Sequence, residues 1–103
     1  MKDKEEEVEF DLVLYGWTGE LSPDDHRGGK YRVVAPKDSL LWNFLADWVR
    51  KRPEIEDHFF DPDREDFWSD VFVTLNGRYL SRNENPRVSQ GDSVALIRVA
   101  EGG

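Results

Sequence analysis

The sequence contains no cysteine and only one methionine in 103 residues. Without cysteine there is no disulfide framework, no thiolate metal site and no thiol nucleophile. The chain also has no apolar run of the length needed to cross a bilayer. Its first residues, MKDKEEE, lack the apolar stretch of a secretory signal. These absences predict a protein of the reducing cytoplasm that neither spans a membrane nor is secreted.

Basic residues are also scarce, with 14 Lys and Arg against 22 Asp and Glu and a net charge of −8. The acids concentrate in residues 1–25 and 53–70, whereas residues 71–103 carry three carboxylates and four arginines. Such a balance argues against nucleic-acid binding, because phosphates attract Lys and Arg. It favours a basic protein partner through electrostatic steering, although a charge run is more often simply solvated. We interpret residues 1–7 as a flexible acidic tail.

At this length the chain can bury one modest core, so we expect a single domain over residues 8–100. Residues 8–16 alternate between apolar side chains and a second set that includes Glu9, Asp11 and Tyr15. Period two with β-branched and aromatic residues is typical of a strand with one buried face. Residues 17–29 are rich in turn formers and predict a loop, and residues 30–36 predict a second strand that ends at Pro36.

A helix is expected between Asp38 and Arg52. Asp38 or Ser39 is the predicted N-cap, because both side chains can accept a bond from a free backbone N–H. Apolar residues follow at helical spacing, and Pro53 stops the helix by disfavouring the helical region for the residue before it. Residues 54–70 have no clear periodicity. They predict a long connection with at most a short helical turn, attached by some of its aromatic residues: Phe59, Phe60, Phe67 and Trp68.

The segment VFVTL-NG-RYLS (71–81) carries the strongest hairpin signal in the chain, because Asn-Gly favours a two-residue turn with positive φ. After an irregular link that ends at Gly91-Asp92, residues 93–100 predict a last strand. The order β-β-α-β-β-β gives one main helix, and its apolar stripe has only the sheet to pack against. We therefore expect an α+β fold in which a helix covers one face of a sheet of about five strands, with the first and last strands near its centre.

The other sheet face is the candidate binding surface. The last strand is apolar on both sides, and only one side can meet the helix. On the remaining side we expect Tyr15, Tyr79 and Ile97 to lie together, and apolar groups left out of the core often mark a partner site. Scattered exposed aromatic residues would be the simpler explanation.

Candidate catalytic and metal-binding motifs are weak. His26 and His58 lie far apart and without a nucleophile nearby, so they do not suggest a catalytic triad. The run DPDRED (61–66) has acids at alternating positions, but Asp66 stands where a calcium loop needs glycine and Phe72 where it needs glutamate. Gly28-Gly29 is too short for a phosphate-binding loop. We therefore expect no catalytic residues, no bound cofactor and no metal.

The sequence ends in Glu101-Gly102-Gly103, which predicts a flexible tail over residues 101–103. A terminal carboxylate can be activated as an acyl-adenylate and attacked by a sulfur or nitrogen nucleophile. To reach another protein's active site it must pass through a narrow channel, and glycine removes the side chains that would clash there. The fold would then serve as the handle that the partner holds, whereas the simpler interpretation is an inert disordered end.

VFVTLNGRYL, QGDSVALI and the terminal EGG together resemble the ubiquitin-like β-grasp sulfur carriers. This family includes the molybdopterin synthase small subunit, the thiamine sulfur carrier and related small protein modifiers. The resemblance is most specific over residues 71–103 and extends more loosely to the first strand and the helix. It implies a β-grasp carrier protein rather than an enzyme.

The resemblance implies that an E1-like activating enzyme uses ATP to adenylate Gly103, which becomes a thiocarboxylate, while Gly102 keeps the tail slim. It implies that Tyr15, Tyr79 and Ile97 dock on the activating enzyme or on a sulfur acceptor such as the molybdopterin synthase large subunit. The family's molybdopterin branch usually has two prolines before Gly-Gly, and Arg98 and Val99 stand there instead. A role in tRNA thiolation, a modifier that forms isopeptide bonds and a non-conjugating interaction module therefore remain alternatives.

Overall fold

The computed structural model describes residues 6–15 and 30–99. These residues form seven strands and two helices, in the order β1 (Glu7–Tyr15), β2 (Lys30–Pro36), α1 (Leu41–Arg50), α2 (Pro53–Phe59), β3 (Phe60–Asp61), β4 (Asp66–Phe67), β5 (Val71–Leu75), β6 (Arg78–Leu80) and β7 (Ser93–Arg98). The predicted loop at 17–29 and the predicted strand ends at residues 16 and 100 lie outside the described residues. Neither described helix has the length and apolarity to span a membrane.

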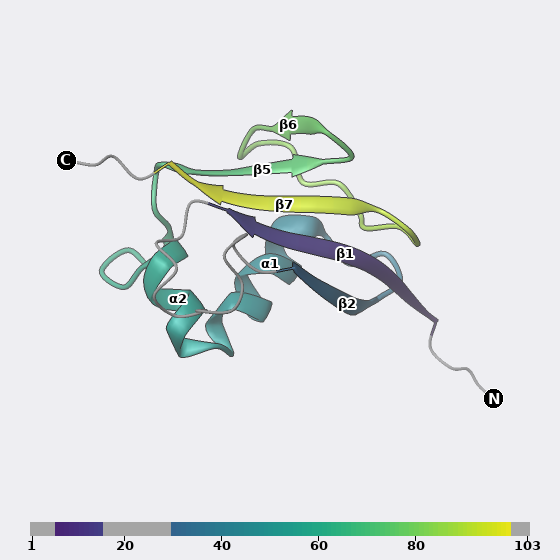
Figure 1. The fold of residues 1–103 in the computed structure, drawn as a ribbon, viewed down its shortest axis with the longest axis horizontal. Helices are drawn as coiled ribbons and strands as arrows, with labels where there is room; N and C mark the ends of the chain where they lie inside the picture. The colour runs from purple at the N-terminus through teal and green to yellow at the C-terminus, as the bar shows by residue number, and fades with distance from the viewer. Residues whose placement is uncertain (1–5, 16–29, 100–103) are drawn as a thin grey trace.

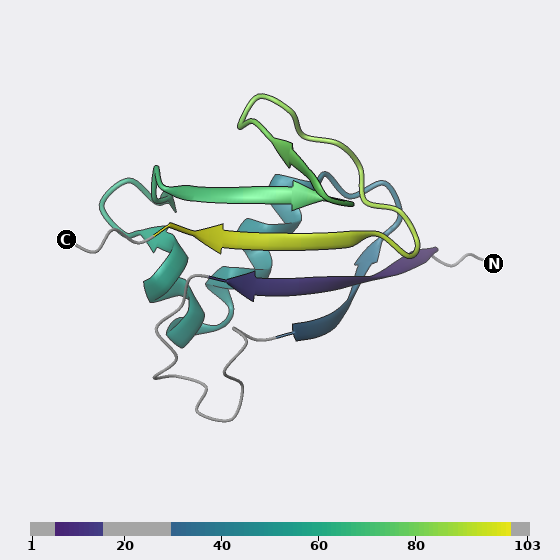
Figure 2. The same cartoon turned by 45° about the horizontal axis from the view of Figure 1, so that its top comes forward.

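Five of the strands form one mixed sheet in the order β2-β1-β7-β5-β6. β1 and β7 are parallel, and the other neighbours are antiparallel. The first and last strands therefore lie at the centre of the sheet, as the sequence predicts. Both helices lie on the same side of the sheet, and no helix or strand of the described residues covers its other face, which we call the open face (Figures 1 and 2). The predicted α+β architecture is confirmed.

The core lies between the sheet and α1. Alternate residues of β1 are fully buried, which are Phe10, Leu12 and Leu14, and β7 contributes Val94 and Leu96. α1 buries four residues at helical spacing: Leu41, Leu45, Trp48 and Val49. The apolar side chains that alternate along the strands thus pack against the apolar side chains of α1 in one layer. Burial of these side chains is the main term that stabilises the fold.

The predicted N-cap of α1 is wrong. Leu40 is the N-cap residue and makes no side-chain cap bond, while the Ser39 hydroxyl donates to the Pro36 carbonyl at 2.7 Å. The free amides of the first turn are instead satisfied from a distant segment. Leu41 N–H donates to the Pro86 carbonyl at 2.8 Å, and Trp42 N–H donates to Asn85 Oδ1 at 2.8 Å. A tertiary contact replaces the local cap.

The connection 54–70 is also more ordered than the sequence analysis predicts, because it contains α2 and the β3–β4 ribbon. The sequence of α2 nevertheless contains local signals for a helix. Pro53 occupies the first helical position, where its missing N–H costs no hydrogen bond. Glu54 and Glu56 lie in the first turn, where the partial positive charge of the helix dipole favours acidic side chains. Ile55 and Phe59 are then buried one turn apart. The aromatic attachment is confirmed, since Phe59, Phe60 and Phe67 belong to the core and Trp68 is partly buried.

The predicted hairpin is present between β5 and β6. Its turn residues Asn76 and Gly77 have φ of 53° and 86°, the positive values that this two-residue turn requires. Gly91, before β7, also has a positive φ of 84°, and its N–H donates to the Glu9 carbonyl at 2.8 Å. This bond fixes the start of β7 against β1.

Replacing Gly91 by alanine is expected to lower the free energy of unfolding by about 1–2 kcal/mol, the cost of a left-handed conformation for a residue with a Cβ. An added Cβ meets no heavy atom within 4 Å, so the loss reflects backbone strain alone. Urea unfolding followed by circular dichroism measures it. Gly91→Asn is the matched control, because asparagine tolerates this region better. An alanine variant as stable as the wild type would contradict the assignment.

Candidate functional site

The open face of the sheet carries a row of apolar side chains near the end of β7. Tyr15 of β1 lies opposite Ile97 of β7, and Ile97 lies opposite Phe72 of β5. Tyr79 of β6, which pairs with Thr74, packs edge-to-face against Phe72 with ring centroids 6.2 Å apart. Opposite residues on one sheet face are side-chain neighbours, so the row crosses four adjacent strands.

These side chains remain accessible to solvent. Tyr79 is 66% exposed, Val99 51%, Tyr15 46% and Phe72 42%, and Ile97 lies partly buried between them. We call this group (Tyr15, Phe72, Tyr79, Ile97 and Val99) the tail-side patch. A contiguous exposed apolar surface of this kind typically marks a site of contact with another molecule.

The structure brings together the three residues predicted for the partner face, since Tyr15, Tyr79 and Ile97 all lie in the tail-side patch. Their docking role remains a prediction. Phe72 is a member of the patch that the sequence analysis misses as a binding residue. The signal for it is present, because Phe72 stands between the buried Val71 and Val73 and must therefore face the open side.

An open hollow of about 540 Å³ borders the patch, lined by Phe72, Tyr79 and Val99 and by Glu84 of the link after β6. The Glu84 carboxylate accepts from the Ser81 N–H at 2.9 Å and pairs with Arg78 at 3.3 Å. Both contacts, the backbone bond first, lower the pKa of Glu84. The carboxylate is therefore ionised at neutral pH. Its small contribution to stability is lost as the pH falls through this lowered pKa.

The end of β7 is anchored by Arg98. Its Nε pairs with Asp70 Oδ1 at 3.1 Å, its Nη1 donates to the His58 carbonyl at 2.8 Å, and its guanidinium lies 5.1 Å from the centre of the Trp68 ring. The next residue, Val99, donates its N–H to the Asp70 carbonyl at 3.0 Å. The Arg98 side chain and the Val99 main chain thus hold the end of β7 to residues 54–70, which the sequence analysis predicts as an irregular connection.

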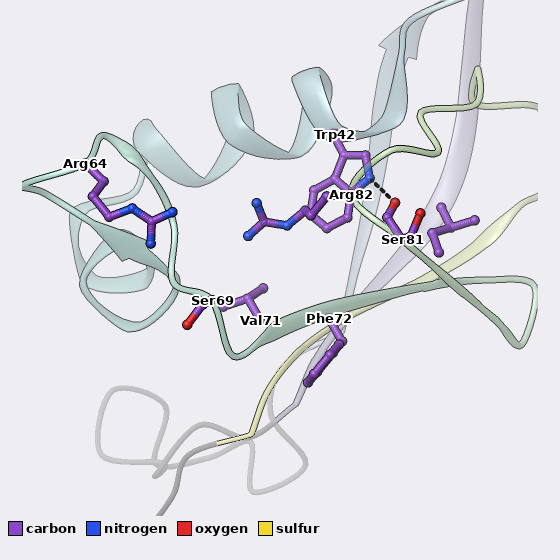
Figure 3. A pocket seen from close by; sticks show the side chains of 8 residues that line it. Trp42, Arg64, Ser69, Val71, Phe72, Ser81 and Arg82 are labelled. Atoms are coloured by element: carbon purple, nitrogen blue, oxygen red, sulfur yellow. Dashed lines mark hydrogen bonds between the residues drawn. The ribbon is translucent and has the colours of Figure 1, made fainter.

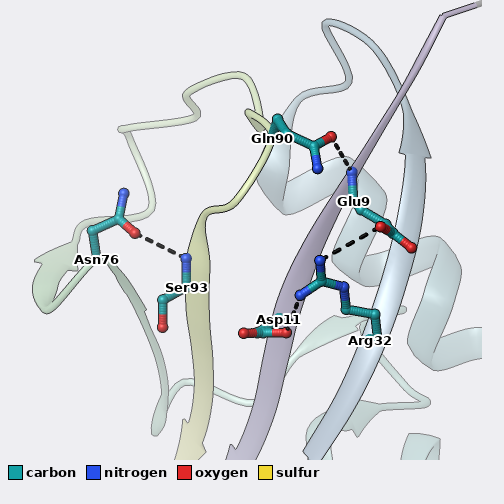
Figure 4. A network of polar contacts seen from close by, with 6 residues as sticks. All are labelled: Glu9, Asp11, Arg32, Asn76, Gln90 and Ser93. Atoms are coloured by element: carbon teal, nitrogen blue, oxygen red, sulfur yellow. Dashed lines mark hydrogen bonds and ion pairs between the residues drawn. The ribbon is translucent and has the colours of Figure 1, made fainter.

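The opposite end of the open face is polar (Figure 4). Arg32 of β2 reaches across to Asp11 at 2.9 Å and Glu9 at 3.5 Å, and the Asp11 bond contributes most to the raised pKa of Arg32. Nearby, Ser93 N–H donates to Asn76 Oδ1 at 2.8 Å. Exposed ion pairs add little stability, but they divide the face into a charged half and an apolar half.

A second hollow, of about 280 Å³, lies between α1, the β3–β4 connection and the β5–β6 hairpin (Figure 3). Its lining includes Trp42, Arg64 and Arg82, while Phe72 points its ring away from Trp42. Arg82 is already engaged, because its guanidinium lies 4.8 Å from the Trp42 ring centre and pairs with Asp66 at 3.5 Å. We interpret this arrangement as attachment of the β3–β4 ribbon rather than as a free anion site.

A candidate metal-binding cluster is not found in the described part of the chain. Residues 6–15 and 30–99 contain no group of three or more His, Cys, Asp or Glu side chains that could hold a metal. His58 belongs to α2, and His26 lies outside the described residues. The acidic run 61–66 forms the tight connection between β3 and β4, where Asp63 N–H donates to Asp61 Oδ1 at 2.9 Å. Gly102 and Gly103 also lie outside the described residues.

No protein-family model and no curated protein sequence matches this chain. Similar solved structures exist at low sequence identity. SAMP1 from Haloferax volcanii has a TM-score of 0.68 at 22% identity, over 92% of this chain and 99% of that one. The small archaeal modifier protein 1 from Methanosarcina acetivorans has a TM-score of 0.66 at 13% identity, over 95% and 99%.

A third similar structure is a putative molybdopterin converting factor, subunit 1, from Pyrococcus furiosus. Its TM-score is 0.59 at 20% identity, and the match covers 90% of this chain and 99% of that one. The similarity spans nearly all of each protein, so it concerns the complete architecture and not a shared hairpin. This chain therefore has the ubiquitin-like β-grasp fold that these modifier and converting-factor proteins share.

Proposed function

We propose that this chain is a carrier protein whose terminal Gly103 carboxylate is adenylated by an E1-like enzyme with ATP, which releases pyrophosphate. Sulfide-level sulfur from a donor then displaces AMP from the acyl-adenylate and leaves a thiocarboxylate. The sulfur is then donated to an acceptor enzyme, in the manner of a molybdopterin synthase small subunit. The chain supplies the tail and the docking surface, and the partner supplies the catalytic residues.

The observation that carries this proposal is the position of the tail-side patch. The patch surrounds the end of β7, and only four residues lie between Arg98 and the last residue of the sequence. A partner that holds Tyr15, Phe72 and Tyr79 is therefore close to the point from which the terminal glycines continue. The fold shared with a molybdopterin converting factor subunit adds support.

The direct test is the intact mass of the purified full-length protein after incubation with ATP, the adenylating enzyme of the same organism and a sulfur donor. We expect the mass to rise by the difference between sulfur and oxygen, and the same spectrum reports whether the chain ends at Gly103. Deletion of Gly103 should abolish the change. A wild-type protein that never gains an acyl-adenylate or a thiocarboxylate would exclude the carrier role.

The docking role of the patch is tested with Tyr79→Ala. We expect this variant to form the thiocarboxylate about tenfold more slowly, because aromatic residues often carry much of the binding energy of an interface. Val34→Ala is the matched control, since Val34 is an exposed apolar residue on the same sheet face but in β2. Equal rates for the two variants would exclude the patch as the docking surface while leaving the tail chemistry standing.

Conjugation to other proteins is the second candidate function, and the similarity to proteins named as modifiers favours it. Trypsin cuts after Arg98 in a denatured digest, so a lysine joined to Gly103 would carry the remnant Val-Ala-Glu-Gly-Gly. Detection of that remnant on lysines of other proteins distinguishes a modifier from a carrier that only delivers sulfur.

A further inference from the structure

The hollow beside the tail-side patch is apolar except for one carboxylate and one hydroxyl. The described residues that line it are Phe72, Tyr79, Leu80, Val99, Ser81 and Glu84. Its volume of about 540 Å³ lies within the range of about 300–1,000 Å³ that is usual for small-ligand sites. The hollow therefore has room for one long side chain of another molecule, and the charge that its described lining offers is negative.

The carboxylate of Glu84 is fixed in position but not fully used. The Ser81 N–H donates to Glu84 Oε1 at 2.9 Å, and Arg78 Nη1 donates to Oε2 at 3.3 Å. The short backbone bond orients the carboxylate, whereas the Arg78 contact is long and its two side chains are exposed. A carboxylate offers about four lone-pair positions to donors. Glu84 can therefore accept from a further donor without losing the bond that orients it.

Covering the tail-side patch also takes Glu84 out of water. Phe72, Tyr79 and Val99 belong both to the patch and to the lining of the hollow, so a partner that contacts the patch closes the hollow as well. Burial of a charge is unfavourable unless the charge is paired. A partner with apolar side chains alone would leave Glu84 with its long contact to Arg78, which lies outside the lining. A partner that fits this surface therefore brings a cation.

The aromatic rings beside Glu84 favour arginine over lysine as the source of that cation. Phe72 and Tyr79 pack edge to face and are both exposed. A guanidinium is planar, lies on aromatic rings and can donate two parallel hydrogen bonds to a carboxylate, whereas an ammonium is a strongly hydrated point charge. The alkyl part of an arginine side chain can also cover apolar surface.

The chain already contains this arrangement at the end of β7. The Arg98 guanidinium lies 5.1 Å from the centre of the Trp68 ring and pairs with Asp70 at 3.1 Å, so that one arginine contacts both an aromatic ring and a carboxylate. By contrast, no arginine in the described part of the chain lies over the ring of Phe72 or Tyr79. The same combination of ring and carboxylate is thus open to an arginine from another molecule.

We propose that Glu84 is a specificity-determining residue of the tail-side patch, and that the partner that docks there inserts an arginine side chain into the adjoining hollow. The guanidinium contacts the Tyr79 ring, donates to the Glu84 carboxylate and displaces Arg78 toward solvent. This inference rests on the proposed function, because it assigns a chemistry to the partner that holds the patch.

The first test is an NMR titration of the ¹⁵N-labelled full-length protein with the peptide acetyl-Leu-Arg-Leu-amide. We expect saturable shifts at the amides of Tyr79, Ser81 and Glu84. A peptide with citrulline, which resembles arginine in shape but has no charge, should bind at least about threefold more weakly. Glu84→Gln should remove this difference, since glutamine still accepts from the Ser81 N–H but is neutral. Equal binding of the two peptides to the wild type, shifts only elsewhere or no shifts would overturn the proposal.

Arg78→Gln tests the competition for the carboxylate. It removes the cation that now contacts Glu84, so the arginine peptide should bind this variant about twofold more tightly than the wild type. Weaker binding would contradict the assignment of Glu84 as the group that takes the partner's cation.

The second test measures thiocarboxylate formation by the adenylating enzyme of the same organism at increasing carrier concentrations. We expect Glu84→Gln to raise KM about tenfold with little change in kcat, because docking is weakened and the tail is unaltered. Glu54→Gln is the matched control, since it removes the same charge from α2, on the helix side of the sheet.

The outcomes separate this inference from the carrier function. Equal KM values for the two variants would refute the role of Glu84 and leave the carrier function standing. A wild type that forms neither acyl-adenylate nor thiocarboxylate would refute the carrier function, and the peptide titration would still decide whether the hollow takes an arginine.

Discussion

Replacement of Phe67 by alanine is expected to lower the free energy of unfolding by about 3–5 kcal/mol, the usual cost of truncating a buried aromatic side chain. Phe67 is 2% exposed, and its ring lies 4.9 Å from that of Phe60 and 5.6 Å from that of Trp42. Alanine would leave a cavity between the β3–β4 ribbon and α1. Urea unfolding at neutral pH, followed by far-ultraviolet circular dichroism, measures the loss.

Phe72→Ala is the matched control, because it removes the same side chain from a position that is 42% exposed. Its expected cost is about 1 kcal/mol or less, since little buried area is lost. Equal costs for the two variants would mean that the segment 53–70 is an appendage that folds independently of the core. A large difference would establish that this acidic segment is an integral part of the domain.

Replacement of Arg98 by alanine is expected to lower the free energy of unfolding by about 1–3 kcal/mol, because it removes charge-assisted hydrogen bonds at a partly buried site. The Arg98 side chain is 28% exposed, and its loss leaves the Asp70 carboxylate and the His58 carbonyl without this donor. Thermal or urea unfolding measures the change. A double-mutant cycle with Asp70→Ala isolates the energy of the pair.

Arg78→Ala serves as the control for Arg98, since the side chains of the Arg78–Glu84 pair are 64% and 46% exposed and the pair should contribute no more than about 1 kcal/mol.

A second measurement tests the anchor of β7, by which we mean the contacts of Arg98 and Val99 with Asp70. In native digestion, trypsin should cut the wild type more slowly after Arg98 than after the exposed Arg87, and Asp70→Asn should speed the cut at Arg98. Equal rates at both arginines would mean that the anchor does not hold in solution.

The anchor links the acidic segment to the proposed function. Asp70 ends that segment, and through its side chain and its carbonyl it holds both Arg98 and Val99. If the terminal glycines carry sulfur, this contact fixes the point from which they leave the fold.

The main architecture is readable from the sequence because its signals are local. Alternation in residues 8–15 assigns Phe10, Leu12 and Leu14 to the core, and Asn76-Gly77 specifies the hairpin turn. The apolar positions left over on the last strand predict an open binding face that includes Ile97. Each of these inferences needs only the alternation of apolar residues along a strand, their spacing along a helix, or the residues of one turn.

The elements that sequence reasoning misses depend on partners far along the chain. Asp38 and Ser39 have good capping side chains, yet Asn85 and Pro86 satisfy the first amides of α1, and a distance of 43 residues hides that contact from local rules. The helix α2 is short and acidic, so its stability comes from the burial of Ile55 and Phe59 rather than from propensity.

The sequence by itself therefore determined the order of α1 and of the five strands of the main sheet, and the two faces of that sheet. Only the tertiary structure decided that Phe72 joins Tyr15 and Tyr79 in one patch and that Arg98 is held by Asp70. The physical reason is that side-chain alternation is a property of each strand alone, whereas strand neighbours, and with them every contact between strands, are set by the path of the whole chain.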